Sequence, residues 1–198
     1  NTCPYRRMGA CGGEELLDTV ANLVEYPVGV WGSFDEEYLE LPREVLVNAM
    51  VEHQRYIPVE APDGALTPNF ISISNTRARD LKVVAHGNEK VLRARLADAM
   101  FFFREDTARP LGDYVDGLNR VLYQEKLGTS YEKMERFRDL ALRLQSILDV
   151  SSPELVERAA VLCKADLLTQ MVYEFPKLQG VIGRVYALIS GEKEEVAE

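Results

Sequence analysis

The spacing of apolar residues differs between the two halves of the chain: it is mixed in the first half and helical in the second. In the first half, the apolar-rich run at positions 15–30 is interrupted by Pro27. Further on, Pro42 precedes apolar positions at helical spacing, which predicts a helix with proline near its start. These positions are Val45, Leu46, Ala49 and Met50.

The next segment, residues 55–75, has the pattern of two strands. Isoleucines alternate with serines at 71–74, and the Pro-Asp-Gly sequence at 62–64 supplies a turn between the two apolar runs. Because proline cannot donate a hydrogen bond to a strand ladder, Pro58 and Pro68 predict edge strands or bulges.

From Asn88 onward the apolar period is helical. Thr129 and Glu132 have the spacing of a capping box at the start of one helix. Ser152, followed by a proline, predicts the start of the next. The helix that begins near Thr129 has one apolar stripe, made of Met134, Phe137, Ala141, Leu144 and Leu148.

These patterns predict an α+β fold in two parts. A mixed α/β module occupies residues 1–85, with a loose lead-in at 1–13, and an all-helical domain occupies residues 86–198. The 198 residues, 46% of them hydrophobic, are enough for one large domain or two small ones. The chain starts at Asn1 without a methionine, and we interpret it as an internal piece of a longer protein.

Charged residues interrupt the apolar stripe of the helix that follows Asn88. Arg95 and Asp98 are three positions apart, which is close enough for their side chains to pair. A charge beside so much apolar surface needs a partner, so we predict a partly buried Arg95–Asp98 ion pair. Ligand contact by Arg95 is the alternative. The stripe consists of Leu92, Leu96, Ala99 and Phe103.

Three cations, Lys90, Arg93 and Arg104, share another face of the same helix. Glu89 lies four positions before Arg93 and can pair with it. The face is either a solvated charged surface or a short cationic strip for phosphate. The formal net charge of −9 argues against nonspecific coating of nucleic acid, but a local basic patch can act separately from the rest of the surface.

Two further places combine polar side chains with apolar surroundings. The junction between helix and strand holds His53 and Arg55, which either recognise a ligand or lock the loop. Asp166 falls within the apolar stripe of the helix predicted from Pro153, where a carboxylate must be hydrogen-bonded, paired or protonated. We predict that Asp166 ties its helix to a neighbouring backbone or arginine, with a functional role as the alternative.

The sequence lacks the patterns of common catalytic sites. The two histidines, His53 and His86, are isolated, so no metal site is predicted. No phosphate-binding loop, dinucleotide fingerprint or nucleophile elbow is present, so no catalytic residue is predicted. Three cysteines at unrelated spacings predict a reducing, cytosolic setting. No apolar run approaches the ~18 residues that span a membrane.

Seven stretches of the chain, taken together and in order, resemble the β subunit of the bacterial heterotetrameric glycyl-tRNA synthetase. They read ANLVEYPV, GSFDEEYLELPREVL, EHQRYIPV, FISISN, GNEKVLRARLADAMFFF, YQEKLGTSYEKMERF and KADLLTQMVYEFPKLQGVIGRVYA. The resemblance covers roughly residues 14–198, whereas residues 1–13 match poorly.

This resemblance implies an internal piece of the tRNA-recognising subunit of a ligase. The family's enzyme joins glycine to its tRNA with ATP and Mg²⁺, and the adenylation chemistry belongs to the separate α subunit, so no cofactor is expected on this chain. The expected partners are tRNA-Gly, the α subunit and the remaining β-subunit domains, in the cytoplasm, with no DNA and no membrane. The candidate tRNA contacts are Lys90, Arg93, Arg104, His53 and Arg55.

The resemblance also implies that residues 86–198 form a degenerate HD-type domain. Ala165 and Asp166 stand where active HD hydrolases have an adjacent His-Asp pair that helps to hold a metal. The missing histidine implies that the hydrolase chemistry is lost and that Asp166 is kept for structure. Two alternatives are an active metal-dependent phosphohydrolase of the HD type and a scaffold that contacts other protein domains without touching RNA.

Overall fold

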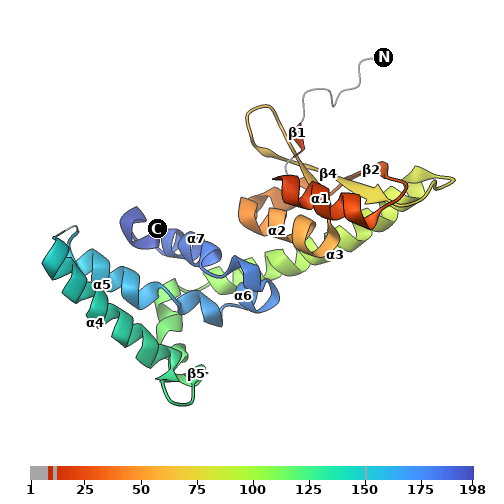
Figure 1. The fold of residues 1–198 in the computed structure, drawn as a ribbon. Helices are drawn as coiled ribbons and strands as arrows, with labels where there is room; N and C mark the ends of the chain where they lie inside the picture. The colour runs from red at the N-terminus through yellow and green to blue at the C-terminus, as the bar shows by residue number, and fades with distance from the viewer. Residues whose placement is uncertain (1–8, 11–12, 150) are drawn as a thin grey trace. The chain divides into compact units, whose positions relative to one another are not determined.

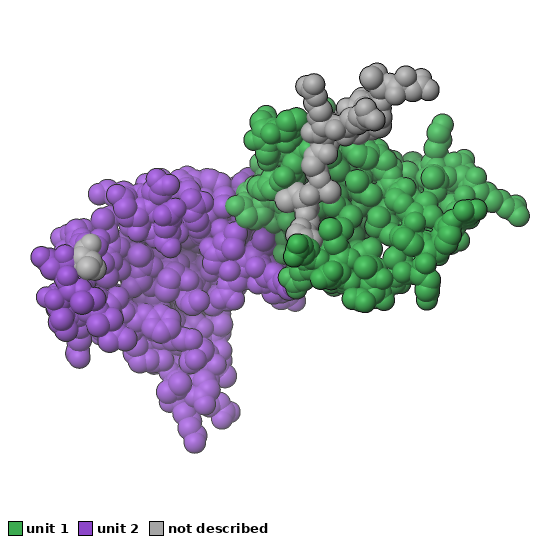
Figure 2. Space-filling model, turned by 45° about the horizontal axis from the view of Figure 1, so that its top comes forward, with its two compact units in different colours: residues 1–101 green, residues 102–198 purple. Residues whose placement is uncertain are grey.

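The computed structural model describes residues 9–10, 13–149 and 151–198 as an α+β fold with two compact units (Figures 1 and 2). The first unit ends at Phe101, so the division falls inside helix α3 (Leu81–Thr107). The sequence pattern placed the domain boundary at residue 85, near the start of this helix. Most of the predicted loose lead-in lies outside the described residues.

The first unit contains a four-stranded antiparallel sheet, with strand order β1-β3-β4-β2. Strands β3 and β4 and helix α2 confirm the two strands and the helix predicted from the sequence, and the four predicted apolar positions of α2 are all buried. Before α3, the elements are β1 (Gly9–Ala10), α1 (Gly13–Leu23), β2 (Val28–Ser33), the 3-10 helix η1 (Glu36–Glu40), α2 (Arg43–Gln54), β3 (Ile57–Glu60) and β4 (Leu66–Ser74).

The prolines of the sheet lie at an irregularity of the ladder. Pro68 belongs to β4, which is a central strand, so the edge-strand alternative does not hold for it. The register between β3 and β4 shifts between Pro58 and Glu60, as the bulge alternative predicts. Beside this shift the hydroxyl of Thr67 donates to the carbonyl of Val59 at 2.9 Å, which supplies a partner for that buried carbonyl.

Phe70 lies at the centre of the first unit. Its side chain is fully buried and stacks on Tyr56 with ring centroids 4.7 Å apart. The paired residue on β2 is Gly32, where a Cβ atom would lie only 2.3–2.8 Å from the Phe70 ring, so this position requires glycine. Other fully buried side chains of the first unit include Met50 on α2 and Leu92 and Leu96 on α3.

Helix α3 begins at Leu81, about two turns before the start predicted at Asn88. The side chain of Asp80 accepts a hydrogen bond from the backbone N–H of Lys82 at 2.8 Å and so satisfies one of the free donors of the first turn. Gly87 therefore lies inside the helix. A glycine in this position weakened the helical pattern and hid the true start.

The second unit is helical except for one hairpin, which corrects the prediction of an all-helical domain. After the end of α3, its elements are the 3-10 helix η2 (Leu111–Arg120), the hairpin strands β5 (Leu122–Gln124) and β6 (Gly128–Thr129), α4 (Ser130–Leu148), α5 (Pro153–Leu162), the 3-10 helix η3 (Ala165–Leu168), α6 (Gln170–Glu174), the 3-10 helix η4 (Pro176–Leu178), α7 (Val181–Ile189) and α8 (Glu194–Ala197). The predicted capping box of Thr129 and Glu132 is confirmed at the start of α4.

The helix predicted from Pro153 is broken after Leu162, so Asp166 lies in η3 and not on the stripe of α5. Thr169 restarts the helix as its N-cap, because its hydroxyl oxygen accepts from the backbone N–H of Val172 at 3.3 Å. The same hydroxyl donates to the carbonyl of Asp166 at 2.7 Å. These bonds satisfy backbone groups that a continuous helix would otherwise pair.

Candidate nucleic-acid interface

The early start of α3 lengthens the cationic face predicted from the sequence. At about 100° per residue, Lys82 and His86 fall within the same arc of about 80° as Lys90 and Arg93. All four side chains are exposed. We call these four residues the α3 basic strip. It runs for about 16 Å along the helix at ~1.5 Å per residue.

The loop before α3 adds two exposed arginines, Arg77 and Arg79. The loop is anchored by Asn75, whose side-chain oxygen accepts from the backbone N–H groups of Glu25 and Tyr26 at 2.9 and 2.8 Å. The Arg77 guanidinium bonds to the Tyr26 hydroxyl, and its central carbon lies 5.1 Å from the centroid of the Tyr26 ring. Sequence reasoning missed these two cations, although Arg77, Arg79 and Lys82 fall within six residues.

Acidic residues border one end of the α3 basic strip. Arg93 pairs with Asp35 at 3.2 Å, and about half of each side chain is exposed. Glu89 does not follow the predicted pairing with Arg93, because its carboxylate accepts from the backbone N–H of Ser33 at 2.9 Å. The Ser33 contact joins the end of β2 to α3, and the Asp35 pair joins the start of η1 to α3. A phosphate that approached Arg93 would compete with the Asp35 carboxylate, so Lys82 and Lys90 are better placed to meet one.

Arg95 has a different neighbour from the predicted one. Its guanidinium Nη2 lies 3.1 Å from Nε2 and 3.4 Å from Nδ1 of His53, at the end of α2. No bond joins Asp98 to Arg95 among the described residues, so the predicted Arg95–Asp98 pair is corrected to an Arg95–His53 contact. The three-residue spacing on one helix had favoured Asp98 as the partner of Arg95. The observed contact comes from His53, which is 42 positions away in the sequence.

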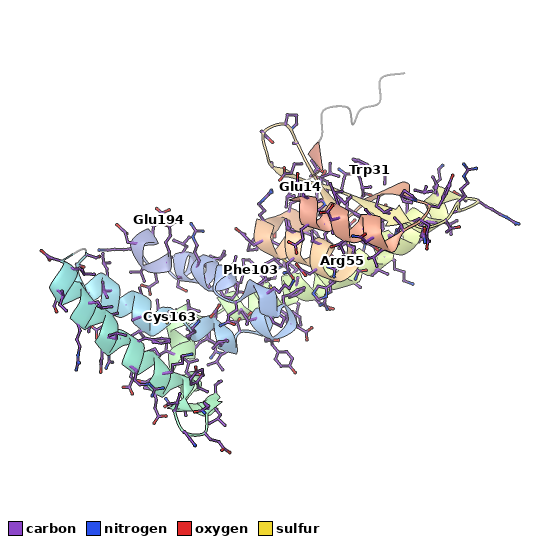
Figure 3. All side chains as sticks on the ribbon, viewed as in Figure 1. Glu14, Trp31, Arg55, Phe103, Cys163 and Glu194 are labelled. Atoms are coloured by element: carbon purple, nitrogen blue, oxygen red, sulfur yellow. The ribbon has the colours of Figure 1, made fainter. Side chains whose placement is uncertain are left out.

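Arg55, labelled in Figure 3, follows the last residue of α2. Its backbone is left-handed, with φ +55°. Its side-chain Nη1 donates to the carbonyls of Val51 and Glu52 at 3.1 and 3.0 Å. The Val51 carbonyl also accepts from the backbone N–H of Arg55 at 3.2 Å, so the side chain adds to the backbone bonds that close the helix. Arg55 also lines a cavity of about 260 Å³, whose wall includes Tyr56 and Asn88.

Within the first unit, the structure does not gather the candidate tRNA contacts into one site. Lys90 and Arg93 lie on the α3 basic strip. His53 contacts Arg95, which is about 160° around the helix from Arg93, so it lies on another side of α3. Arg55 is engaged at the end of α2, and Arg104 is exposed in the second unit.

Asp166 is buried in the second unit, 1% exposed. Its Oδ2 accepts from the backbone N–H of Gly180 at 2.5 Å, and its Oδ1 is buried without a hydrogen-bond partner among the described residues. Burial raises the pKa of this carboxyl, and the Gly180 amide and Lys164 oppose the rise. Asp166 also crowds Gly183, where a Cβ atom would lie 3.0–3.2 Å from its atoms. The bond to Gly180 matches the predicted backbone tie, and its effect on stability stays a prediction.

Asp106, which sequence reasoning missed, is a second buried carboxylate among the described residues of the second unit. It accepts from the backbone N–H groups of Gln170 and Met171, each at 2.9 Å, and from the hydroxyl of Tyr186 at 3.2 Å. It thus supplies acceptors for the first amides of α6. Burial and the neighbouring Asp106 raise the pKa of the Tyr186 hydroxyl, so it stays a donor. Burial and these partners indicate a structural role.

The described residues offer neither a metal site nor a membrane span. Within the described parts of the chain, no three or more His, Cys, Asp or Glu side chains are grouped so that they could hold a metal ion. Over the same residues, no helix is both long enough and apolar enough to cross a membrane.

The chain is similar to known proteins over almost its whole length. A family model described as the glycyl-tRNA synthetase beta subunit matches residues 7–198. The glycine–tRNA ligase beta subunit of Syntrophotalea carbinolica is 55% identical over 195 residues, and that of Syntrophus aciditrophicus is 56% identical over 184 residues. The subunit of Geobacter metallireducens is 52% identical over 198 residues.

These alignments cover 96%, 93% and 98% of this chain but only 28%, 27% and 29% of the respective relatives. The chain therefore spans less than a third of the length of the relatives it matches. Those relatives are subunits of a ligase of the aminoacyl-tRNA synthetase class. The matched range and the identities lead to one conclusion: this chain belongs to the glycyl-tRNA synthetase β subunit family.

Proposed function

We propose that this chain contributes tRNA binding and subunit assembly to a glycine–tRNA ligase and carries out none of the adenylation chemistry itself. The observation that supports tRNA binding is the α3 basic strip, together with Arg77 and Arg79 in the loop before it. Phosphate contacts by exposed lysine and arginine supply much of the affinity of proteins for nucleic acid. In an otherwise acidic chain, such a strip would direct RNA to one face of the first unit.

Lys82 and Lys90 are the proposed phosphate contacts of the strip. Both are exposed, and they lie two turns apart on α3, which is about 12 Å at ~1.5 Å per residue. Arg93 has the Asp35 carboxylate 3.2 Å from its Nε, so its contact with a phosphate would be partly offset. Arg104 lies in the second unit, and we assign it no phosphate contact.

A salt titration of tRNA-Gly binding by the complete α/β enzyme tests this proposal. The variant is Lys82→Ala/Lys90→Ala. If both lysines meet phosphates, the slope of log affinity against log salt concentration should fall by about one for each contact removed. The free energy of unfolding should stay within about 0.5 kcal/mol, because both side chains are at the surface.

The matched control is Lys126→Ala/Lys193→Ala, which removes two exposed lysines from the second unit. It has the same change in net charge, so a general electrostatic effect would alter both variants equally. A slope that is unchanged in Lys82→Ala/Lys90→Ala, or that changes as much in the control, would contradict phosphate binding by the strip.

We also propose that the helical unit is of the HD type without metal chemistry, as Ala165 before Asp166 suggests. Asp166 uses its carboxyl to bond the Gly180 amide, which supports a structural role. In this proposal ATP and Mg²⁺ act at the α subunit of a cytoplasmic heterotetramer, and tRNA-Gly, the α subunit and the other β-subunit domains are the partners of this chain.

A further inference from the structure

Helix α4 exposes five large apolar side chains on one side. The exposed fractions are 37% for Phe137, 57% for Leu140, 48% for Leu144, 76% for Ile147 and 61% for Leu148. At about 100° per residue they fall within an arc of about 100°, which is the width of a stripe that normally faces a protein core. We call these residues the α4 apolar strip.

The α4 apolar strip is distinct from the side of the helix that packs within the second unit. α4 packs along α5, and Figure 1 shows the two helices side by side. Ala141, Leu142 and Gln145 are half-buried, and Met134 is 1% exposed. These residues lie on the arc next to the strip. Figure 3 shows side chains projecting from α4 away from α5. The helix therefore has a covered apolar side and an uncovered one.

Spacing within the strip indicates a helical partner. Phe137, Leu140, Leu144 and Ile147 follow one another at intervals of three, four and three residues. This is the spacing of the apolar seam between two helices in a coiled coil, in which each side chain inserts between residues of the facing helix. Phosphate groups of an RNA would leave these five apolar side chains in water.

One edge of the strip is positively charged. Arg136 and Arg143 are exposed and lie one heptad apart beside it, at the positions that flank an apolar seam. At the end of the strip nearest the hairpin, the Lys133 ammonium lies 3.6 Å from the centroid of the Tyr123 ring and 5.3 Å from that of Phe137. A partner helix that presents acidic side chains next to its apolar stripe would complement this edge.

The length of the relatives suggests a source for such a helix. This chain spans 27–29% of the matched β subunits, so more than two thirds of each subunit lies outside it. A segment of the same polypeptide reaches a surface at a much higher effective concentration than a separate molecule does. Large exposed apolar patches are also uncommon on proteins that have no partner for them.

We propose that the α4 apolar strip is the docking site of an amphipathic helix from the part of the β subunit that lies outside these 198 residues, and that this helix carries acidic side chains beside its apolar stripe. The proposal rests on family membership and on the geometry of the second unit. It does not depend on tRNA binding by the first unit, so the two proposals can fail separately.

The test uses the complete α/β enzyme with a photo-crosslinking amino acid in place of Leu140 or Ile147 of the β subunit. After irradiation, mass spectrometry identifies the crosslinked peptides. A mixture of isotope-labelled and unlabelled β subunits separates crosslinks within one polypeptide from crosslinks between two copies. The same amino acid in place of Tyr173, which is 83% exposed and lies on α6, is the matched control for nonspecific reaction.

Both strip positions should crosslink to one segment of the same β polypeptide outside this chain, and Tyr173 should not. That segment should have apolar residues at three- and four-residue spacing with Asp or Glu beside them. Crosslinks to the α subunit, to a second β copy or to tRNA, or no crosslink at all, would overturn the proposal.

Charge reversal on the edge of the strip gives a second, independent readout. Arg136→Glu/Arg143→Glu should reduce the crosslink yield from Leu140 severalfold, because like charges would then face each other. Exchange of the facing acidic residues for lysine in the crosslinked segment should restore the yield. If the charge reversal leaves the crosslink yield unchanged, or if the lysine exchange does not restore it, the partner does not present acidic side chains to this edge.

Discussion

The contribution of Asp166 to stability should depend on pH, because its carboxyl is buried. One of its oxygens accepts from the Gly180 amide, and burial raises its pKa above the ordinary value of ~3.9. The folded state therefore holds a proton on this group at pH values where the unfolded state has lost it. The resulting stabilisation is fully present below the ordinary pKa and is lost as the pH rises through the raised pKa of the folded state.

We expect Asp166→Asn to remove this dependence, since an amide cannot ionise and its oxygen can still accept from Gly180. The free energy of unfolding, measured with denaturant from about pH 4 to pH 8, should fall less steeply with pH in this variant than in the unchanged chain. Asp166→Ala should instead cost about 1–3 kcal/mol, because the Gly180 amide loses its acceptor. The exposed Asp116→Asn is the control. Equal pH profiles for all the chains would contradict the assignment.

At the residue scale, the sequence could show which groups need partners but not always which partners they have. Arg95 was recognised as a cation beside apolar surface, yet its contact, His53, comes from another helix. Asp106 gave no signal, because it follows Arg104 and Glu105 in what reads as a polar helix end. Its three donors come from residues at least 64 positions away, which only the folded chain brings near.

At the element scale, the start of α4 depends on a glycine. Gly128 has φ +81°, and a Cβ atom there would lie 1.7 Å from the Glu132 carboxylate that accepts from the Thr129 amide in the capping box. Gly128→Ala should therefore lower the free energy of unfolding in two ways. Loss of the cap should cost about 1 kcal/mol, and an alanine in the left-handed conformation should cost a further ~1–2 kcal/mol.

Gly64→Ala is the matched control, since Gly64 has φ +86° and a Cβ atom added there would meet nothing within 4 Å. It should show the conformational cost alone. Denaturant unfolding of both variants gives the difference, which we expect to be about 1 kcal/mol. If the two variants lose the same stability, the clash with Glu132 does not break the capping box.

Local and distant determinants explain which elements could be predicted. The capping box of α4 is complete within four residues, so the sequence shows it directly. The segment that follows the break at Leu162 is held by hydrogen bonds that the first amides of α6 donate to Asp106 and that the Gly180 amide donates to Asp166. Because those partners are distant in the sequence, the apolar pattern alone predicted one continuous helix.

At the scale of the whole molecule, an apolar period marks a face to be covered but does not say what covers it. The stripe predicted on α4 divides in the structure: Met134 is buried in the second unit, whereas Leu144 and Leu148 are exposed. The proposed cover for this face is a helix from outside these 198 residues, since the chain spans less than a third of the relatives that it matches. The sequence thus predicted an amphipathic helix but could not show which apolar residues pack within the second unit and which stay exposed.

The proposed division of labour within the ligase gives a prediction for the whole molecule. The 198 residues contain no phosphate-binding loop and no dinucleotide fingerprint, so this chain should have no means to activate glycine. We expect glycine-dependent exchange of pyrophosphate into ATP to stay at background for this chain and for the complete β subunit. Addition of the α subunit should produce exchange, which serves as the positive control. Exchange above background in a sample free of α subunit would place adenylation chemistry on the β polypeptide and contradict the proposed function.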